Sequence, residues 1–357
     1  MPGKKFLIIQ QKMIGDVLTS TVICEKLKNI YPDCIIHFVA NENTLAVLEH
    51  NPNIDRITVF EKKYKTSKKA FYIFLKSLRR ESYDTVIDAY GKLESNLMSL
   101  FSRAEYKIAL EKWYTRWIYS HTIKENLVPQ HNIPLAIQNR LNLLSPILKE
   151  TNSDIYFPKI YLTAAEIQNA KNEVTALKTS PEEKFIMISI LGSSPMKTYP
   201  AEYMAEVLDT IASHTNAKIL FNYIPNQREE AFVIYEKCKA VTQKQIEINF
   251  YANSLRDFLS LLSQCSVLIG NEGGAVNMAK ALHMPTFCIF SPFILKGAWH
   301  SDSSQLHKSV HLRDFKPDTL KNVDKNYIKK NIQNLYADFE PALFQDSLVE
   351  FLNHHAN

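Results

Sequence analysis

Short apolar runs alternate with helical patterns along this chain, and this alternation constrains the fold more than any other feature of the sequence. Such runs are typical of strands buried on both faces of a sheet. Strands that alternate with helices form βαβ units and therefore a parallel sheet. The predicted strands lie at residues 6–9, 35–39, 57–60, 84–88, 185–191, 218–223, 246–248, 267–269 and 286–290.

The strand–helix pattern occurs in two series of similar size, and 357 residues suit two domains better than one. Polar residues 149–154 approach the boundary between the series, and residues 164–177 read as a helix. We therefore predict an α/β protein with two Rossmann-like domains, at residues 1–165 and 166–324, that face a central cleft. Residues 325–357 read as helices that pack back across this cleft toward the first domain.

Composition and charge exclude several classes of protein. The net charge is only +5, so an anionic partner must be met by local clusters, and no module typical of nucleic-acid binding is present. The five cysteines show no CxxC pair and read as reduced thiols of a cytoplasmic protein. No apolar run reaches the roughly 18 residues of a membrane span, and residues 1–5 lead into a strand without a signal peptide.

Residues 267–282 carry the strongest local signal for ligand binding. A predicted strand ends in the adjacent glycines Gly273 and Gly274, and Ala275 opens a helical pattern. Backbone N–H groups point outward from a helix N-terminus, and glycine lets a ligand approach them closely. The turn is therefore suited to a phosphate group. The alternative is a plain connection between a strand and a helix.

A second turn of this kind follows the first predicted strand. Gly15 ends a loop, and Asp16 lies at or near the start of the next helix. Open α/β sheets bind ligands at the carboxyl ends of their strands, which makes Asp16 a candidate functional carboxylate. The alternative is an ordinary N-cap, a position that aspartate favours.

A basic segment with an apolar face, residues 62–80, separates the third and fourth strands. It suits contact with an anionic surface, such as phospholipid or a phosphorylated glycolipid, with Phe71, Phe74 and Leu75 available for shallow insertion. Alternatively, the helix packs on the sheet and its charges are solvated. The aromatic and basic stretch 112–119 either lines an acceptor cleft or packs internally. The candidate acceptor-binding lysines are Lys62, Lys63, Lys65, Lys68 and Lys69.

Several motifs of nucleotide-binding proteins are missing from the sequence. There is no GxGxxG, no P-loop and no Asp-x-Asp to hold a metal on a diphosphate. His307 and His311 have no evident third ligand and read as solvated histidines. We therefore predict no cofactor and no metal. Helix N-termini and a lysine must then neutralise any bound diphosphate, and the candidate is Lys197, in the loop after residues 185–191.

Four blocks of the sequence follow one another in an order and spacing that are typical of one family. They are residues 6–38 with Gly15-Asp16, residues 83–95, residues 197–200 with the sequence Lys-Thr-Tyr-Pro, and residues 270–299 with the glycine turn. Together they cover roughly residues 5–300 and resemble glycosyltransferase family 9, the ADP-heptose:lipopolysaccharide heptosyltransferase family.

The resemblance implies a GT-B fold with the acceptor on the first domain and a nucleotide-sugar on the second. It implies an inverting, metal-independent transfer, foremost of heptose from ADP-heptose, to a lipopolysaccharide-core or related cell-envelope glycan. A lipid-linked acceptor implies peripheral contact with the inner face of the cytoplasmic membrane. By the same match Asp16 is the base, beside Gly15, and the donor-binding residues are Lys197, Glu272, Gly273, Gly274, Ala275 and Asn277.

Three departures from the family pattern leave the donor sugar open. The usual Asp-Thr/Ser-Gly turn is Glu272-Gly273-Gly274 here, so a hydroxyl donor is missing. The downstream histidine is Asn277, and Ser291 stands where glycine is common. One alternative is a transferase of this family that uses another nucleotide-sugar. A second is a nucleotide-sugar epimerase of the same architecture, and a third, should Asp16 only cap its helix, is a non-catalytic binding protein.

Overall fold

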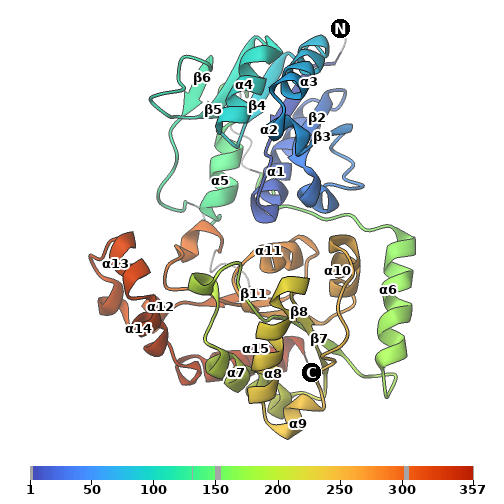
Figure 1. The fold of residues 1–357 in the computed structure, drawn as a ribbon, viewed down its shortest axis with the longest axis vertical. Coiled ribbons are helices and arrows are strands. Elements are labelled where there is room, and N and C mark those ends of the chain that lie inside the picture. The colour runs from blue at the N-terminus through green and yellow to red at the C-terminus, as the bar shows by residue number, and fades with distance from the viewer. Residues whose placement is uncertain (1–2, 131, 149–153, 301–304, 357) are drawn as a thin grey trace. The chain divides into compact units, whose positions relative to one another are not determined.

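The computed structural model describes residues 3–130, 132–148, 154–300 and 305–356 (Figure 1). The chain divides into two compact units. Unit 1 is Met1–Tyr161 with Gly297–Trp299, and unit 2 is Leu162–Lys296 with His300–Asn357. The boundary falls four residues before the predicted one, because the helix that begins at Ala164 packs entirely within unit 2. Residues 149–153 of the predicted linker approach lie outside the described residues.

Unit 1 is built on a parallel sheet with the strand order β3-β2-β1-β4-β5-β6. The central strand β1 has the sequence KFLII and is buried on both faces. Successive side chains of a strand point to opposite faces, so helices must cover both. The strands are β1 Lys5–Ile9, β2 Ile35–Asn41, β3 Arg56–Phe60, β4 Thr85–Asp88, β5 Tyr106–Leu110 and β6 His121–Ile123.

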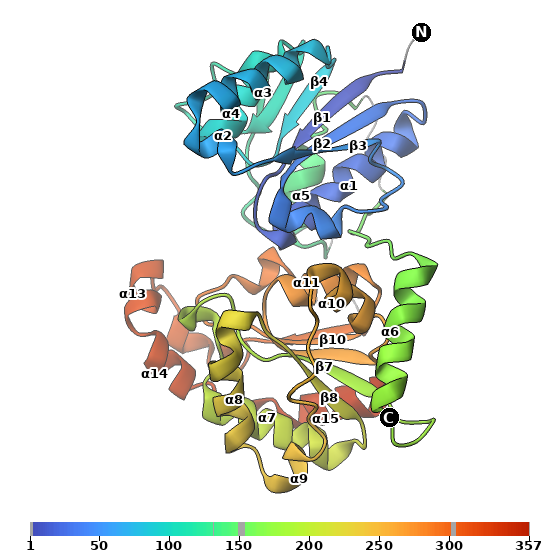
Figure 2. The same cartoon turned by 45° about the vertical axis from the view of Figure 1, so that its right-hand side comes forward.

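The helices of unit 1 cover the two faces of this sheet in pairs, as Figure 2 shows. α3 packs beside α4, and Phe74, Leu75 and Leu78 of α3 share a core with Leu7 and Ile9 of β1. α1 packs beside α5 on the other face. The helices are α1 Ile14–Ile30, the 3₁₀ helix η1 Glu42–Val47, α2 Lys63–Thr66, α3 Lys68–Arg80, α4 Leu93–Ser102 and α5 Leu135–Asn142.

Unit 2 repeats the arrangement with the parallel strand order β11-β10-β9-β7-β8. The central strands again read as apolar runs, for example FIMIS in β7. Gly270 of β9 has a φ of +127°, and a Cβ there would lie 2.5 Å from the Ser189 carbonyl oxygen, so only glycine fits. The strands are β7 Phe185–Ser189, β8 Lys218–Asn222, β9 Val267–Asn271, β10 Thr286–Ile289 and β11 His307–Val310.

The helices of unit 2 surround one large core that includes the end of the chain. The longer ones are α6 Ala164–Leu177, α7 Ala201–His214, α8 Arg228–Lys237, α10 Leu255–Leu262, α11 Gly274–Ala281 and α15 Gln345–His355. The shorter ones are α9 Ala240–Gln243, α12 Leu312–Phe315, α13 Lys325–Lys330, α14 Ile332–Ala337 and the 3₁₀ helices η2 Pro195–Lys197, η3 Pro225–Gln227, η5 Pro317–Leu320 and η6 Pro341–Leu343. The 3₁₀ helix η4 Lys296–Ala298 begins in unit 2 and continues into the segment that belongs to unit 1.

The C-terminal helices are where the observed organisation differs from the predicted one. α15 packs on α7, and the rings of Phe344 and Phe351 lie 6.1 and 5.6 Å from the ring of Phe287 in β10. The Tyr199 hydroxyl donates to the carbonyl of Phe339. These contacts make residues 325–356 an integral part of unit 2 rather than a separate segment, because their apolar side chains complete its core.

The alternation of strands and helices predicted the α/β class and two Rossmann-like units correctly. It missed β5, β6 and β11, and it predicted a strand at residues 246–248 where only an isolated bridge joins Ile246 to Ile219.

Candidate functional site

Asp16 lies in the first turn of α1, directly after the loop that follows β1. The helix begins at Ile14, and its N-cap is Met13, which has a φ of 60°. Asp16 is therefore the third residue of the helix and not its cap, so the capping alternative is wrong. Its carboxylate is partly exposed, with 28% of the side-chain surface accessible, and Gly15 beside it is buried.

Arg140 holds the Asp16 carboxylate from a distant element. Its Nη2 lies 2.7 Å from Oδ1 of Asp16, and its Nε lies 3.4 Å from the hydroxyl of Ser20. Arg140 comes from α5, which packs on α1, and its side chain is only 12% exposed. A charge-assisted bond to an orienting arginine fixes the position of the carboxylate. The sequence analysis missed Arg140, because no motif spacing marks an arginine 124 residues away.

Asp88 fixes a second loop at the same edge of the sheet. It ends β4, which neighbours β1, and is 1% exposed. Its Oδ1 accepts N–H groups from Tyr90 and Gly91 at 3.0 and 2.7 Å, and its Oδ2 accepts the Tyr119 hydroxyl at 2.6 Å. Burial raises the pKa of Asp88 and also the pKa of Tyr119. Asp88 thus shapes the turn at Gly91, a role that the sequence analysis did not assign.

Lys197 lies in a tight loop after β7. Gly192 opens this loop, and a Cβ at Gly192 would lie 2.2 Å from the carbonyl oxygen of Lys197, so the loop can close only around glycine. The N–H of Gly192 donates to the Thr198 hydroxyl at 3.1 Å. The ammonium of Lys197 lies 3.1 Å from Oε1 of Glu272, whose side chain is 7% exposed. Two predicted donor-binding residues are therefore in direct contact.

The position of the lysine loop is set by three side chains from other parts of unit 2. The hydroxyls of Ser291 and Tyr336 both donate to the carbonyl of Met196, at 2.7 and 3.1 Å. Asn271, at the end of β9, accepts the N–H of Tyr199 at 2.7 Å and donates to the carbonyl of Ser189 at 3.0 Å. Ser291, noted above as a departure from the family pattern, therefore has a structural role here.

The glycine turn places the start of α11 next to this ion pair. Glu272 directly follows the last residue of β9, Gly273 has a φ of +157°, and Gly274 is the first residue of α11. Within the described residues, no side chain caps the N-terminus of α11. Its first N–H groups are thus available to an anion. Ala275 is buried and packs the helix on the sheet, and Asn277 is half-buried one turn further along.

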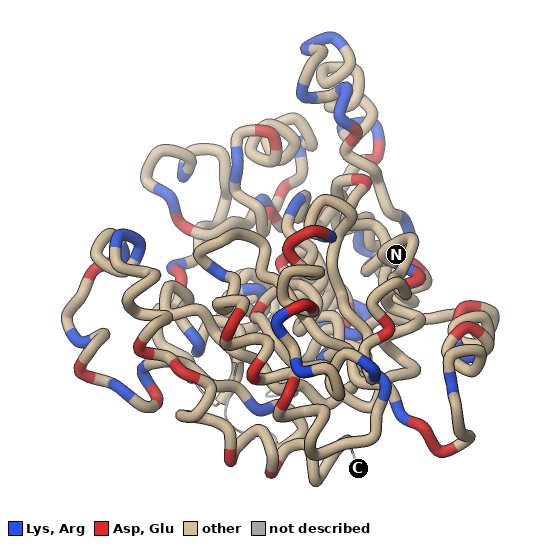
Figure 3. Tube along the Cα trace, turned by 60° about the horizontal axis from the view of Figure 1, so that its bottom comes forward, with Lys and Arg blue, Asp and Glu red and all other residues tan. Residues whose placement is uncertain are grey.

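The predicted acceptor-binding lysines all lie on the surface of unit 1. Lys62 precedes α2, Lys63 and Lys65 lie in it, and Lys68 and Lys69 begin α3. Figure 3 colours the lysines and arginines of the chain blue along the trace. Lys63 pairs with Glu61 at 2.8 Å, an exposed contact that contributes little.

The predicted insertion of aromatic side chains from this segment needs a correction. Phe74 and Leu75 are 6% and 4% exposed, and Phe71 packs partly on the same core, because the apolar face of α3 faces the sheet. The exposed apolar side chains of α3 are instead Tyr72 and Ile73. In the stretch 112–119, by contrast, the rings of Trp113 and Trp117 are 84% and 71% exposed, at the carboxyl end of β5.

His307 and His311 are not solvated, contrary to the prediction. His311 is buried and His307 is half-buried, and burial lowers the pKa of each to about 4. The Nδ1 of His311 accepts the N–H of Arg313 and caps α12, and the Nδ1 of His307 lies 3.2 Å from the Thr286 hydroxyl. In the part of the chain that the structure describes, no group of three or more His, Cys, Asp or Glu residues is arranged to hold a metal ion.

Solved structures share this fold over nearly the whole chain. A glycosyl transferase of family 9 from Veillonella parvula DSM 2008 is 18% identical, with a TM-score of 0.73 over 94% of this chain and 97% of that one. The E. coli heptosyltransferase WaaC with ADP is 16% identical, with a TM-score of 0.66 over 93% of this chain and 99% of that one. These likenesses define the fold as the GT-B type.

The chain belongs to glycosyltransferase family 9 (heptosyltransferase), whose family model matches residues 72–295. Lipopolysaccharide heptosyltransferase 1 of Campylobacter coli is 25% identical over 297 residues, which are 80% of this chain and 83% of that protein. Lipopolysaccharide heptosyltransferase 3 of Escherichia coli is 26% identical over 283 residues, 77% of this chain and 80% of that protein. The resemblance seen in the four sequence blocks is confirmed.

Proposed function

We propose that this enzyme transfers heptose from ADP-heptose to a lipopolysaccharide-core or related cell-envelope glycan, by an inverting displacement that needs no metal. The observation that carries the proposal is the Lys197 ammonium beside the uncapped start of α11, which makes a site for a diphosphate in a chain of this family. The relatives reported above are named as heptosyltransferases, which favours heptose over other sugars.

On the donor side, the leaving diphosphate must be stabilised as the bond to the anomeric carbon breaks. The N–H groups of Gly274 and Ala275 and the Lys197 ammonium supply positive charge from fixed positions. Glu272 keeps Lys197 near the turn before the donor arrives. Because the loop is held by Ser291, Tyr336 and Asn271, little reorganisation is needed during the reaction.

On the acceptor side, the Asp16 carboxylate takes the proton of the attacking hydroxyl. A carboxylate in the first turn of a helix is a weak base, which suffices when the proton leaves late in an oxocarbenium-like displacement. Arg140 restricts the carboxylate to one orientation, so Oδ2 is the oxygen left to meet the acceptor. Gly15 adds no side chain beside it.

We further propose that the enzyme acts in the cytoplasm, at the inner face of the membrane, on a lipid-linked acceptor. Lys62, Lys63, Lys65, Lys68 and Lys69 then contact anionic groups of the acceptor or of the membrane surface. Among the described residues, no helix is long and apolar enough to cross a membrane.

Release of ADP from ADP-heptose, followed with and without a lipopolysaccharide-core acceptor, tests the proposal. A transferase releases ADP at a high rate only with acceptor and forms a glycan one heptose heavier, as mass spectrometry can show. An epimerase would consume ADP-heptose without acceptor, and a binding protein would consume none. If the enzyme used only another nucleotide-sugar, the proposed donor would be wrong. Activity should survive EDTA; a loss that magnesium or manganese restores would contradict the metal-independent mechanism.

A further inference from the structure

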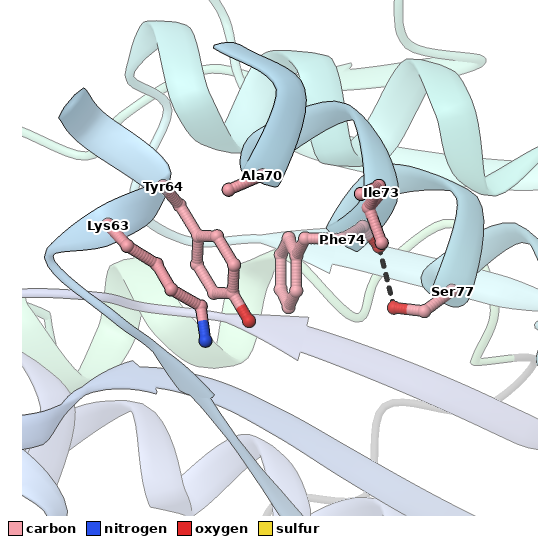
Figure 4. A pocket seen from close by; sticks show the side chains of 6 residues that line it. All are labelled: Lys63, Tyr64, Ala70, Ile73, Phe74 and Ser77. Carbon is pink, nitrogen blue, oxygen red and sulfur yellow. Dashed lines mark hydrogen bonds between the residues drawn. The ribbon is translucent and has the colours of Figure 1, made fainter. Parts of the chain in front are cut away.

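A small apolar pocket opens between α2 and α3 on the surface of unit 1 (Figure 4). Its volume is about 240 Å³. The floor is formed by the rings of Tyr64 and Phe74, which stack with centroids 4.5 Å apart and planes 25° from parallel. The lining residues are Lys63, Tyr64, Ala70, Ile73, Phe74 and Ser77.

One stripe of α3 forms the wall of this pocket. Ala70, Ile73, Phe74 and Ser77 have the spacing i, i+3, i+4, i+7, which places them on one side of a helix. Ser77 turns its hydroxyl to the carbonyl of Phe74 at 2.7 Å, so it presents no free donor to the pocket. Ile73 is 58% exposed, and the small side chain of Ala70 leaves the space open.

The two helices that form the pocket carry many positive charges. Residues 61–80 contain eight lysines and arginines and one acidic residue, so this segment alone carries more positive charge than the net +5 of the whole chain. All eight basic side chains are exposed. Lys63 stands at the rim, and Lys76 lies 4.8 Å from the centre of the Tyr72 ring beside Ile73.

The geometry points to a docking site for an anionic membrane lipid, whose acyl chain enters the pocket between Tyr64, Phe74 and Ile73 while its phosphate meets the surrounding lysines. This inference refines the proposed membrane contact and rests on it. A pocket of this size is smaller than the roughly 300–1,000 Å³ sites that enclose a whole small molecule, and it suits one end of a chain. An apolar hollow within a cationic rim complements an acyl chain below an anionic head group.

The pocket lies near the edge of the sheet at which the proposed base is found, so a lipid bound there can help to present the acceptor. α2 follows β3 directly, and β3 lies two strands from β1, after which Asp16 is found. Two strand spacings amount to roughly 10 Å. A lipid held at α2 therefore brings the membrane surface to the edge of unit 1 that presents the proposed base.

The test uses the full-length protein with vesicles of phosphatidylcholine, alone or mixed with phosphatidylglycerol, and three variants. Ile73→Gln removes an apolar wall without changing charge, and Ala70→Leu fills the pocket. Val233→Gln, at an exposed apolar position of α8 in unit 2, is the matched control. Sedimentation should show wild type and control bound to the mixed vesicles, and both pocket variants bound on the order of tenfold more weakly.

A second measurement separates the pocket from simple charge attraction. Butyl, hexyl and octyl phosphate carry the same head group, and a chain that enters the pocket should strengthen binding by up to about fourfold per methylene. The Ala70→Leu variant should lose this dependence on chain length. The inference would be overturned if wild type and Ile73→Gln bound the vesicles equally, or if the affinity for alkyl phosphates did not depend on chain length. Binding of an acidic protein helix in place of lipid would also overturn it.

Failure of this inference can be told from failure of the proposed function. Ile73→Gln should transfer heptose to a water-soluble, delipidated core acceptor at the wild-type rate and lose rate only on vesicle-bound acceptor. If wild type binds the vesicles through the pocket but transfers heptose to neither acceptor, the proposed function is wrong and the lipid site remains. If transfer is normal on both acceptors for all variants, the lipid site is wrong.

Discussion

Unit 1 and unit 2 each place a helix start at the carboxyl edge of a parallel sheet, yet they present different chemical groups there. In unit 1 the group is a side chain, the Asp16 carboxylate, oriented by Arg140. In unit 2 it is the backbone at the start of α11, supplemented by Lys197. We propose that the same βα geometry serves proton transfer in one unit and anion binding in the other.

The two sites also differ in how tightly their surroundings are fixed. The lysine loop of unit 2 is tied to Ser291, Tyr336 and Asn271, and the C-terminal helices complete its core. Asp16 rests on one arginine and remains partly exposed. A site that stabilises charge benefits from fixed donors, whereas a base must stay accessible to an incoming hydroxyl. The predictions below test this division of roles.

Asp16→Asn should cause the largest loss, because it removes the proposed proton acceptor and leaves the proposed donor site in the other unit intact. We expect turnover to fall roughly 10²–10⁴-fold, with unchanged affinity for ADP. Steady-state transfer assays and calorimetric titration with ADP measure the two quantities. Asp33→Asn, at an exposed turn of the same unit, is the control. Near-wild-type turnover of Asp16→Asn would contradict its role as base.

Lys197→Ala should act on the donor instead. Loss of a charge-assisted contact to phosphate should weaken ADP binding roughly ten- to a hundredfold. The substitution also leaves Glu272 buried without its cation, which adds repulsion toward the diphosphate. Glu272→Gln combined with Lys197→Ala should therefore recover part of the affinity that Lys197→Ala loses. If the double variant binds no better than the single one, Glu272 has no electrostatic effect on the donor.

The strands at the centre of each sheet could be predicted because burial on both faces makes them continuous apolar runs. β5 begins with Tyr106 and Lys107 and has only three consecutive apolar residues, β6 has three residues in all, and β11 reads HKSV. Strands with so short an apolar run, or none, pair as the neighbouring strand dictates rather than as their own sequence indicates. The sequence therefore predicted the long apolar strands, including the edge strands β3 and β8, and missed β5, β6 and β11.

Some residues of the candidate site could likewise be predicted from the sequence, and others could not. Asp16, Lys197 and the glycine turn lie within short motifs, where a strand, a loop and a helix are consecutive in the chain. Arg140 reaches Asp16 across 124 residues, and Tyr336 reaches Met196 across 140. Contacts of that range depend on how helices pack on the sheet, and a single sequence contains no local signal for them.

Glu166→Gln should lower the stability of unit 2 in a manner that depends on pH. Arg256 lies 2.6–2.7 Å from both carboxylate oxygens of Glu166 and, with the bonds from Thr163, lowers the pKa of Glu166 from 4.5 to about 2. A carboxylate whose pKa is lower in the folded state stabilises the fold at pH values above its pKa in the unfolded state. This stabilisation is lost as the pH falls toward the pKa in the folded state. The ion pair joins α6 to α10, so its loss loosens α6.

We expect the free energy of unfolding of Glu166→Gln to be about 1.5–3 kcal/mol below wild type at pH 7. The difference should shrink as pH falls below about 4.5 and vanish near pH 2. Urea denaturation at several pH values measures it, and Glu173→Gln, an exposed position of the same helix, should show no difference at any pH. A constant gap down to pH 3 would show that the ion pair is not its source.

Gly273→Ser should have the smallest effect and restores the hydroxyl that the family usually has at this position. Within the described residues no atom lies within 4 Å of a Cβ built at Gly273, so the side chain has room, although a φ of +157° is one that L-residues adopt rarely. One added hydrogen bond to the diphosphate is offset in part by that backbone strain. We expect ADP to bind about threefold more tightly and AMP to bind as before. Gly273→Ala carries the same strain without a hydroxyl and should bind ADP slightly less tightly than wild type. If the serine and alanine variants behave alike, the turn of unit 2 recognises the diphosphate through its backbone and Lys197 alone. Glycine in place of the family's usual serine or threonine would then remove no contact to the donor.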